Sequence, residues 1–186
     1  MSSFYANITL QSADIEELAA YLKSNGDVAY VAAGSKGTAV VFHEDLSAQE
    51  RLAARLSAHF GCPALLVMAY GRGVLLYHLY EKGEQTDAYV SCPHDDLELR
   101  DPAPAGNAQL LCAAFGMERS ERRVESILRK EGKPEQPYEY AINRHGELAQ
   151  ALGLPAFAAG TGFGAIEMGE LPAGPGFDPG KLRRTP

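Results

Sequence analysis

A run of β-type sequence interrupted by glycine turns occupies residues 63–91 and constrains the fold most strongly. Its segments are residues 63–70, 74–81 and 85–90, and the turns between them contain Gly71, Gly73 and Gly83. Glycine permits the positive φ that tight hairpin turns require. In segment 74–81 both alternating sets of side chains are largely apolar, which predicts a strand covered on both faces and central in its sheet. We expect the rest of the chain to pack on this strand.

The residues before this run alternate between strand and helix patterns. Side chains alternate over residues 4–10, and residues 28–33 and 38–43 are two short β runs, which together predict three strands. Asp14 and Ser47 open two apolar helical stripes with capping-box spacing. The order strand, helix, strand, strand, helix, strand matches the split βαβ of ferredoxin-like folds. The predicted fold class is α+β: an antiparallel sheet with this ferredoxin-like start and extra hairpin strands, two helices on one face, and a small, mainly helical part after it.

Changes in composition divide the chain into four predicted parts. Residues 1–93 form an α+β sheet domain, 94–106 an acidic linker containing prolines, 107–171 a mainly helical part packed on the sheet, and 172–186 a disordered tail rich in proline and glycine. Asn107 and Ser120 are predicted helix caps, and residues 143–152 predict a further helix. Residues 138–142 have the pattern of a short strand.

Charge and cysteine content restrict the class of protein. The formal net charge is -7, and the most basic stretch, residues 119–133, has no aromatic side chains for base stacking, so the sequence disfavours nucleic acid as a partner. No apolar run approaches the roughly 18 residues of a membrane span, and no signal-peptide pattern is present. The odd set of cysteines, Cys62, Cys92 and Cys112, predicts reduced thiols and a cytoplasmic location.

The densest group of potential metal ligands is residues 92–96 (CPHDD). A thiolate, an imidazole and carboxylates could begin a zinc site, but the other cluster, residues 43–45, lacks matching spacing. Cys92 beside His94 could also form a nucleophile pair, although the adjacent carboxylates would raise the pKa of its thiol. We expect no metal, no cofactor and no catalytic residue, and we keep Cys92 and His94 as candidate ligand-binding residues.

Two glycine-rich runs contain letters of nucleotide-binding motifs. Residues 34–38 (GSKGT) have the letters of a phosphate loop in the wrong order and join two predicted strands, so a hairpin is expected. Residues 160–164 (GTGFG) lack the preceding strand and following helix of a dinucleotide fingerprint. We expect the second run to be a loop against the helical part, and Gly160, Gly162 and Gly164 remain candidate ligand-binding residues.

Several short segments point together to one group of proteins. They are FYANITL at residues 4–10, GCPA at 61–64, LYEKGE at 79–84, YVSCP at 89–93 and RVESIL at 123–128. On these segments, which span most of the chain apart from the tail, the chain resembles a family of uncharacterised bacterial proteins. The resemblance implies a bacterial cytosolic protein and implies no activity.

Tyrosines in the β run supply the leading functional hypothesis. Tyr77, Tyr80 and Tyr89 could form one face, and tyrosine is enriched at protein interfaces. With the acidic segment, this predicts a non-catalytic adaptor or immunity-type module whose partner is another protein. The alternative is a small-ligand or metal-binding protein, or an enzyme, with a site between the sheet and the C-terminal helices. The sequence leaves the oligomeric state open.

Overall fold

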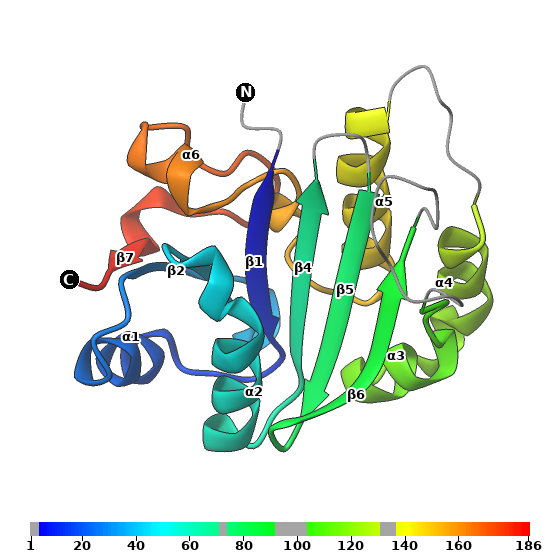
Figure 1. Cartoon of the computed structure of the whole chain (residues 1–186), viewed down its shortest axis with the longest axis horizontal. Coiled ribbons are helices and arrows are strands. Elements are labelled where there is room, and N and C mark those ends of the chain that lie inside the picture. The colour runs from blue at the N-terminus through cyan, green and yellow to red at the C-terminus, as the bar shows by residue number, and fades with distance from the viewer. Residues whose placement is uncertain (1–3, 71–73, 92–103, 131–136) are drawn as a thin grey trace.

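The computed structural model describes residues 4–70, 74–91, 104–130 and 137–186. In these residues one antiparallel sheet has seven strands in the order β6-β5-β4-β1-β3-β2-β7 (Figure 1). The strands are β1 (Tyr5–Leu10), β2 (Ala29–Ala33), β3 (Ala39–His43), β4 (Ala64–Tyr70), β5 (Val74–Glu81), β6 (Glu84–Val90) and β7 (Arg183–Arg184). The order β4-β1-β3-β2 is that of a ferredoxin-like sheet, so the predicted α+β class and its ferredoxin-like start are confirmed.

The central strand of this sheet is β1, and the prediction that segment 74–81 is central was wrong. β1 is the fourth of the seven described strands, and all six of its residues are buried. β5 lies next to the edge strand β6, with one face buried and the other half-buried over most of its length. Alternation of apolar residues indicates which faces are covered, and it carries no information on the position of a strand within the sheet.

One face of the sheet is covered by α1 (Ile15–Ser24) and α2 (Gln49–Phe60), which lie in front of it in Figure 1. The Asp14 side chain caps α1 by accepting hydrogen bonds from the amides of Glu16 and Glu17 at 2.9 and 3.0 Å. Asp45 accepts a bond from the Ser47 amide at 2.8 Å, so the turn before α2 is closed by Asp45 and not by the predicted Ser47 cap. The core on this face is mainly apolar, with Ala6, Ile8, Leu10, Leu18, Leu22, Leu52 and Leu56 all buried, and α2 adds the buried polar residues Gln49 and Ser57.

The opposite face is covered by α3 (Ala108–Phe115), α4 (Glu121–Leu128) and α5 (Pro137–Ala151), which pack on β4, β5 and β6. Residues 138–142 belong to α5, so the predicted short strand was wrong. Proline suits the first position of a helix, and Ala141, His145 and Leu148 then form a buried helical stripe. In the described ranges, every helix is too short or too polar to cross a membrane.

Residues 156–186 cover the remaining part of the second face, over β2 and β3. They include η4 (Ala156–Ala158), α6 (Phe163–Glu167), η5 (Pro179–Lys181) and β7. The predicted disorder of residues 172–186 differs from the structure, because β7 pairs with β2 and the Thr185 hydroxyl donates to the Asp27 carbonyl at 2.7 Å. The Thr185 hydroxyl also accepts from the Ala29 amide at 2.8 Å, so specific hydrogen bonds order a segment whose composition favours disorder.

Candidate functional site

A pocket of about 370 Å³ lies at the Tyr5 end of β1, where the sheet meets α5 and the segment around α6. These elements gather near the N-terminal end of β1 in Figure 1. The residues that line the pocket come from four parts of the chain: Phe4, Tyr5 and Ala6; Glu44 and Leu46; Ile142; and Gly160, Gly162, Phe163, Gly164, Ala165 and Glu170. Its volume is at the lower end of the range of about 300–1,000 Å³ that is typical of small-molecule sites.

The three predicted glycine residues all line this pocket, and two of them are required by its geometry. Gly160 has a φ of +81°, which side chains with a Cβ rarely adopt. At Gly162 an added Cβ would lie 3.1 Å from the Cβ of Tyr5, so glycine allows this segment to contact β1 directly. Gly164 differs, because it lies within α6 and an added Cβ would meet no atom within 4 Å.

A buried amide holds the same segment on β1. The Asn7 side-chain nitrogen donates to the carbonyls of Ala158 and Thr161 at 2.8 and 3.0 Å, and Asn7 is fully buried. The Ala158 carbonyl also accepts from the Thr161 amide at 3.2 Å, whereas Asn7 is the donor to the Thr161 carbonyl, and leaving that carbonyl buried without a partner would cost about 1–3 kcal/mol. Asn7 therefore positions the glycine-rich wall of the pocket from beneath.

A second contact on the same face of β1 joins Tyr5 to α5. The Tyr5 hydroxyl lies 3.1 Å from Nδ1 of His145, and the two rings are nearly parallel with centroids 5.8 Å apart. His145 is buried, and burial lowers the pKa of its imidazole to about 4. The imidazole is therefore neutral near pH 7, and its role in this arrangement is to position Tyr5 in the pocket wall.

The charges on the pocket are exclusively acidic among the described lining residues. Glu44 and Glu170 are exposed carboxylates, and no lysine, arginine or histidine lines the pocket with them. Neither carboxylate forms an ion pair with another residue in the described parts of the chain. The remaining walls are apolar side chains and glycine backbone.

The predicted ligand residues Cys92 and His94 lie outside the described residues, as does the rest of the 92–96 cluster. The other cysteines, Cys62 and Cys112, are buried, and burial raises the pKa of both thiols. A raised pKa reduces the thiolate fraction that nucleophilic attack requires. Among the described residues, no three or more histidine, cysteine, aspartate or glutamate side chains are arranged to hold a metal ion.

The predicted tyrosine surface is absent from the described structure, because its three members are core residues. Tyr77, Tyr80 and Tyr89 are 1%, 5% and 2% exposed. The Tyr77 hydroxyl donates to Asp87 at 2.6 Å and the Tyr89 hydroxyl donates to the Leu128 carbonyl at 2.8 Å. Burial raises the pKa of both Tyr77 and Tyr80, the latter to about 12. The helices that cover each face of the sheet also cover these side chains, which corrects the sequence-based prediction.

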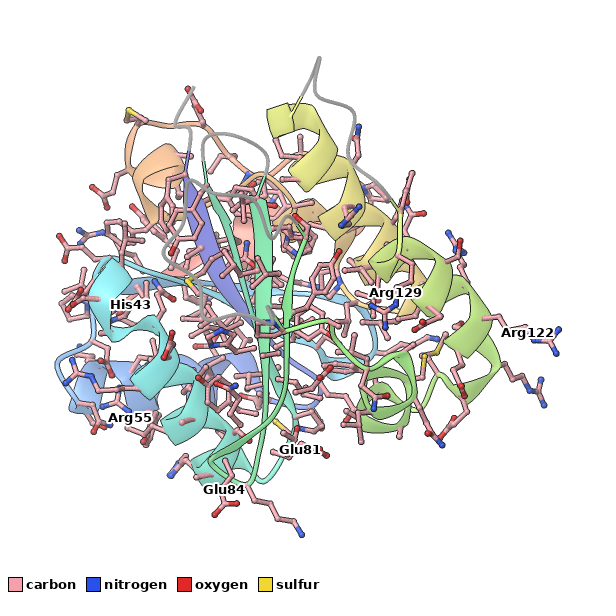
Figure 2. The ribbon with its side chains drawn as sticks, turned by 45° about the vertical axis from the view of Figure 1, so that its right-hand side comes forward. His43, Arg55, Glu81, Glu84, Arg122 and Arg129 are labelled. Atoms are coloured by element: carbon pink, nitrogen blue, oxygen red, sulfur yellow. The ribbon has the colours of Figure 1, made fainter. Side chains whose placement is uncertain are left out.

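The basic stretch of α4 is compensated by neighbouring acids. Arg129 pairs with Glu125 at 2.9 Å and Lys130 pairs with Glu147 at 3.0 Å. Arg122 points from α4 away from the body of the protein (Figure 2). A second, shallower hollow of about 480 Å³ beside α3 and α4 is lined by two arginines and two glutamates, so it offers no net charge to a ligand.

Comparisons with known proteins return no match, whether with protein-family models, curated proteins or solved structures. The candidate site is therefore identified by the geometry of the pocket alone. Sequence reasoning identified only its glycines, and it missed Phe4, Ile142 and Glu170. These residues are far apart in the chain and carry no shared motif, whereas the glycine run is visible because its spacing is local.

Proposed function

We propose that this chain is a non-catalytic binding protein whose small-molecule ligand occupies the pocket at the start of β1. The observation that carries this proposal is the preformed cavity of about 370 Å³ with apolar and glycine walls. Small-molecule sites have this character: a concave, mainly apolar surface with a few polar groups. The alternative formed from the sequence is a ligand site between the sheet and the C-terminal helices, and its candidate residues Gly160, Gly162 and Gly164 line this pocket, which supports the proposal.

The construction of the walls supports binding without large rearrangement. One wall is the first residues of the central strand β1, and the facing wall is held to it by Asn7 and by the close contact at Gly162. A ligand that enters a preordered site loses less binding free energy to the ordering of protein side chains and loops.

Gly164 supplies a direct test, because it lines the pocket and has space for a side chain. Leucine and alanine are both good helix formers, so Gly164→Leu and Gly164→Ala change the backbone of α6 alike and differ in how far they fill the pocket. The isotope-labelled protein would be titrated with a library of neutral, cationic and anionic fragments while its amide NMR signals are recorded.

We expect fragments to shift the signals of residues 4–6 and 163–165, and we expect Gly164→Leu to weaken their binding at least about tenfold. The Gly164→Ala protein should retain binding. If no fragment perturbs these signals, or if Gly164→Leu binds the same fragments as tightly as the original protein, the pocket is not a ligand site.

A second candidate is the adaptor or immunity-type function, with a protein partner. It is favoured by three exposed apolar side chains, the pocket residue Leu46 and the residues Met168 and Leu171, which are 52%, 67% and 47% exposed. Met168 and Leu171 flank the pocket residue Glu170. A stoichiometric partner that is lost on Met168→Glu and Leu171→Glu, but retained by Gly164→Leu, would favour this function over ligand binding.

A further inference from the structure

The side chains of the pocket also restrict the chemistry of its ligand. We infer that the pocket binds a small organic cation, in which a protonated amine is attached to a compact apolar or aromatic body. This inference rests on the proposed ligand-binding function and specifies its ligand class.

The charge of the ligand follows from the two carboxylates. Glu44 and Glu170 reach the same pocket from segments that follow β3 and α6, and none of the described lining residues is basic. Two carboxylates that line one pocket repel an anionic ligand and attract a cation. The net charge of -7 for the whole chain acts in the same direction.

The apolar body follows from the aromatic walls. Phe4 and Phe163 line the pocket, and each is held by a second ring, with Phe4 4.9 Å from Tyr70 and Phe163 5.4 Å from Tyr30 between ring centroids. Fixed aromatic side chains provide apolar contact area and can interact with a cation through their ring faces.

A bare metal ion does not fit these walls. Calcium and magnesium require several converging oxygen ligands, whereas the described pocket residues offer two carboxylates among apolar groups. No metal-holding group of three or more acidic, histidine or cysteine side chains occurs in the described ranges. An ammonium group with an attached hydrocarbon uses both the carboxylates and the phenylalanines.

Three probes of similar shape and different charge test the inference: 2-phenylethylamine, 2-phenylethanol and 3-phenylpropanoate. Their binding would be measured by NMR titration and calorimetry near pH 7 at low salt. We expect the amine to bind about tenfold more tightly than the alcohol, and the carboxylate to bind most weakly. Added salt should weaken the binding of the amine and leave the binding of the alcohol unchanged, because salt screens exposed charges.

Isosteric variants locate the effect. Glu44→Gln and Glu170→Gln should each weaken the binding of the amine about threefold to tenfold and leave the binding of the alcohol unchanged. Glu84→Gln is the matched control, since Glu84 is exposed at the β5–β6 turn, at the opposite end of the sheet from the pocket (Figure 2). All three positions are exposed, so the variants should fold normally, which amide spectra would verify.

The inference is overturned if the amine fails to bind at about 10 mM, if the alcohol binds as tightly as the amine, or if the two glutamine variants leave amine binding unchanged. Gly164→Leu separates this failure from failure of the proposed function. If the alcohol or the carboxylate binds and Gly164→Leu abolishes that binding, the pocket is a ligand site for another chemistry. If Gly164→Leu has no effect on any probe, the pocket itself is not the site.

Discussion

The two faces of β1 are buried equally and by different means. Toward α1 and α2 the strand presents Ala6, Ile8 and Leu10, and toward the C-terminal segments it presents Tyr5, Asn7 and Thr9. None of these six residues is more than 3% exposed. The first face is wholly aliphatic, whereas the second places polar groups in the interior.

The difference lies in what each face requires of its partners. Aliphatic side chains need neighbours of suitable volume, and many apolar residues can supply it. The hydroxyl of Tyr5 and the side-chain nitrogen of Asn7 need polar atoms at fixed positions, and they find them on His145, Ala158 and Thr161. The side-chain oxygen of Asn7 is buried without a hydrogen-bond partner among the described residues. The polar face therefore fixes the segment that forms the pocket, while Ile8 and Leu10 on the aliphatic face contribute stability and do not line the pocket.

The largest effect should come from the aliphatic face. Ile8→Ala leaves a cavity in a fully buried position and should lower the free energy of unfolding by about 3–4 kcal/mol, as measured by urea denaturation. Ligand affinity at the pocket should be unchanged in the fraction that remains folded. A large loss of affinity in folded Ile8→Ala protein would show that the two faces are coupled.

The next effect is a loss of stability at acidic pH that is caused by His145. Burial lowers the pKa of His145 to about 4 from its ordinary 6.5. Between these values the unfolded chain binds a proton that the folded protein does not, so stability should fall as the pH decreases from 6.5 to 4, by roughly 3 kcal/mol from this residue. His145→Gln removes the titrating group. Between pH 6.5 and 4, the free energy of unfolding measured with urea should therefore fall less in this variant than in the original protein. Equal pH dependence in the two proteins would contradict the assignment.

The smallest of the three effects should be the most local. Asn7→Ala removes the donors to Ala158 and Thr161 and should cost about 2 kcal/mol, with faster amide exchange in residues 158–166. Asn25→Ala is the matched control: its amide also donates to a backbone carbonyl, that of Tyr21 at 2.8 Å, but at an exposed helix end. That control should cost less than about 1 kcal/mol. Unchanged exchange over residues 158–166 would mean that Asn7 does not hold the pocket segment.

The fold was predictable from the sequence wherever its signals are local. Asp14 caps a helix and the alternation over residues 4–10 marks a strand, and both signals lie within a few residues of the structure they predict. Residues 138–142 were wrongly predicted as a strand because five residues are too few to show the helical periodicity, which is visible only over the full length of α5.

The pocket and the tyrosines show where sequence reasoning stops. Tyr77 on β5 is a plausible surface residue until α3, α4 and α5 cover that face, and local periodicity does not reveal which layer will do so. Glu44 and Glu170 become neighbours of one cavity only through the tertiary fold. Gly160, Gly162 and Gly164 were identified because they form a local glycine-rich run in the sequence, and of the three only Gly160 has a positive φ.

The bonds from Asn7 have a consequence for folding during synthesis. Asn7 and its two acceptors are 151 and 154 residues apart in the chain. A ribosome releases β1 long before it makes those acceptors, and contacts at such separation fold slowly because a long loop must close. The first six strands can pair earlier, which leaves the second face of β1 uncovered in the nascent chain. The polar residues on that face, Asn7 and Thr9, can be hydrated during this interval, which reduces the apolar surface exposed to aggregation.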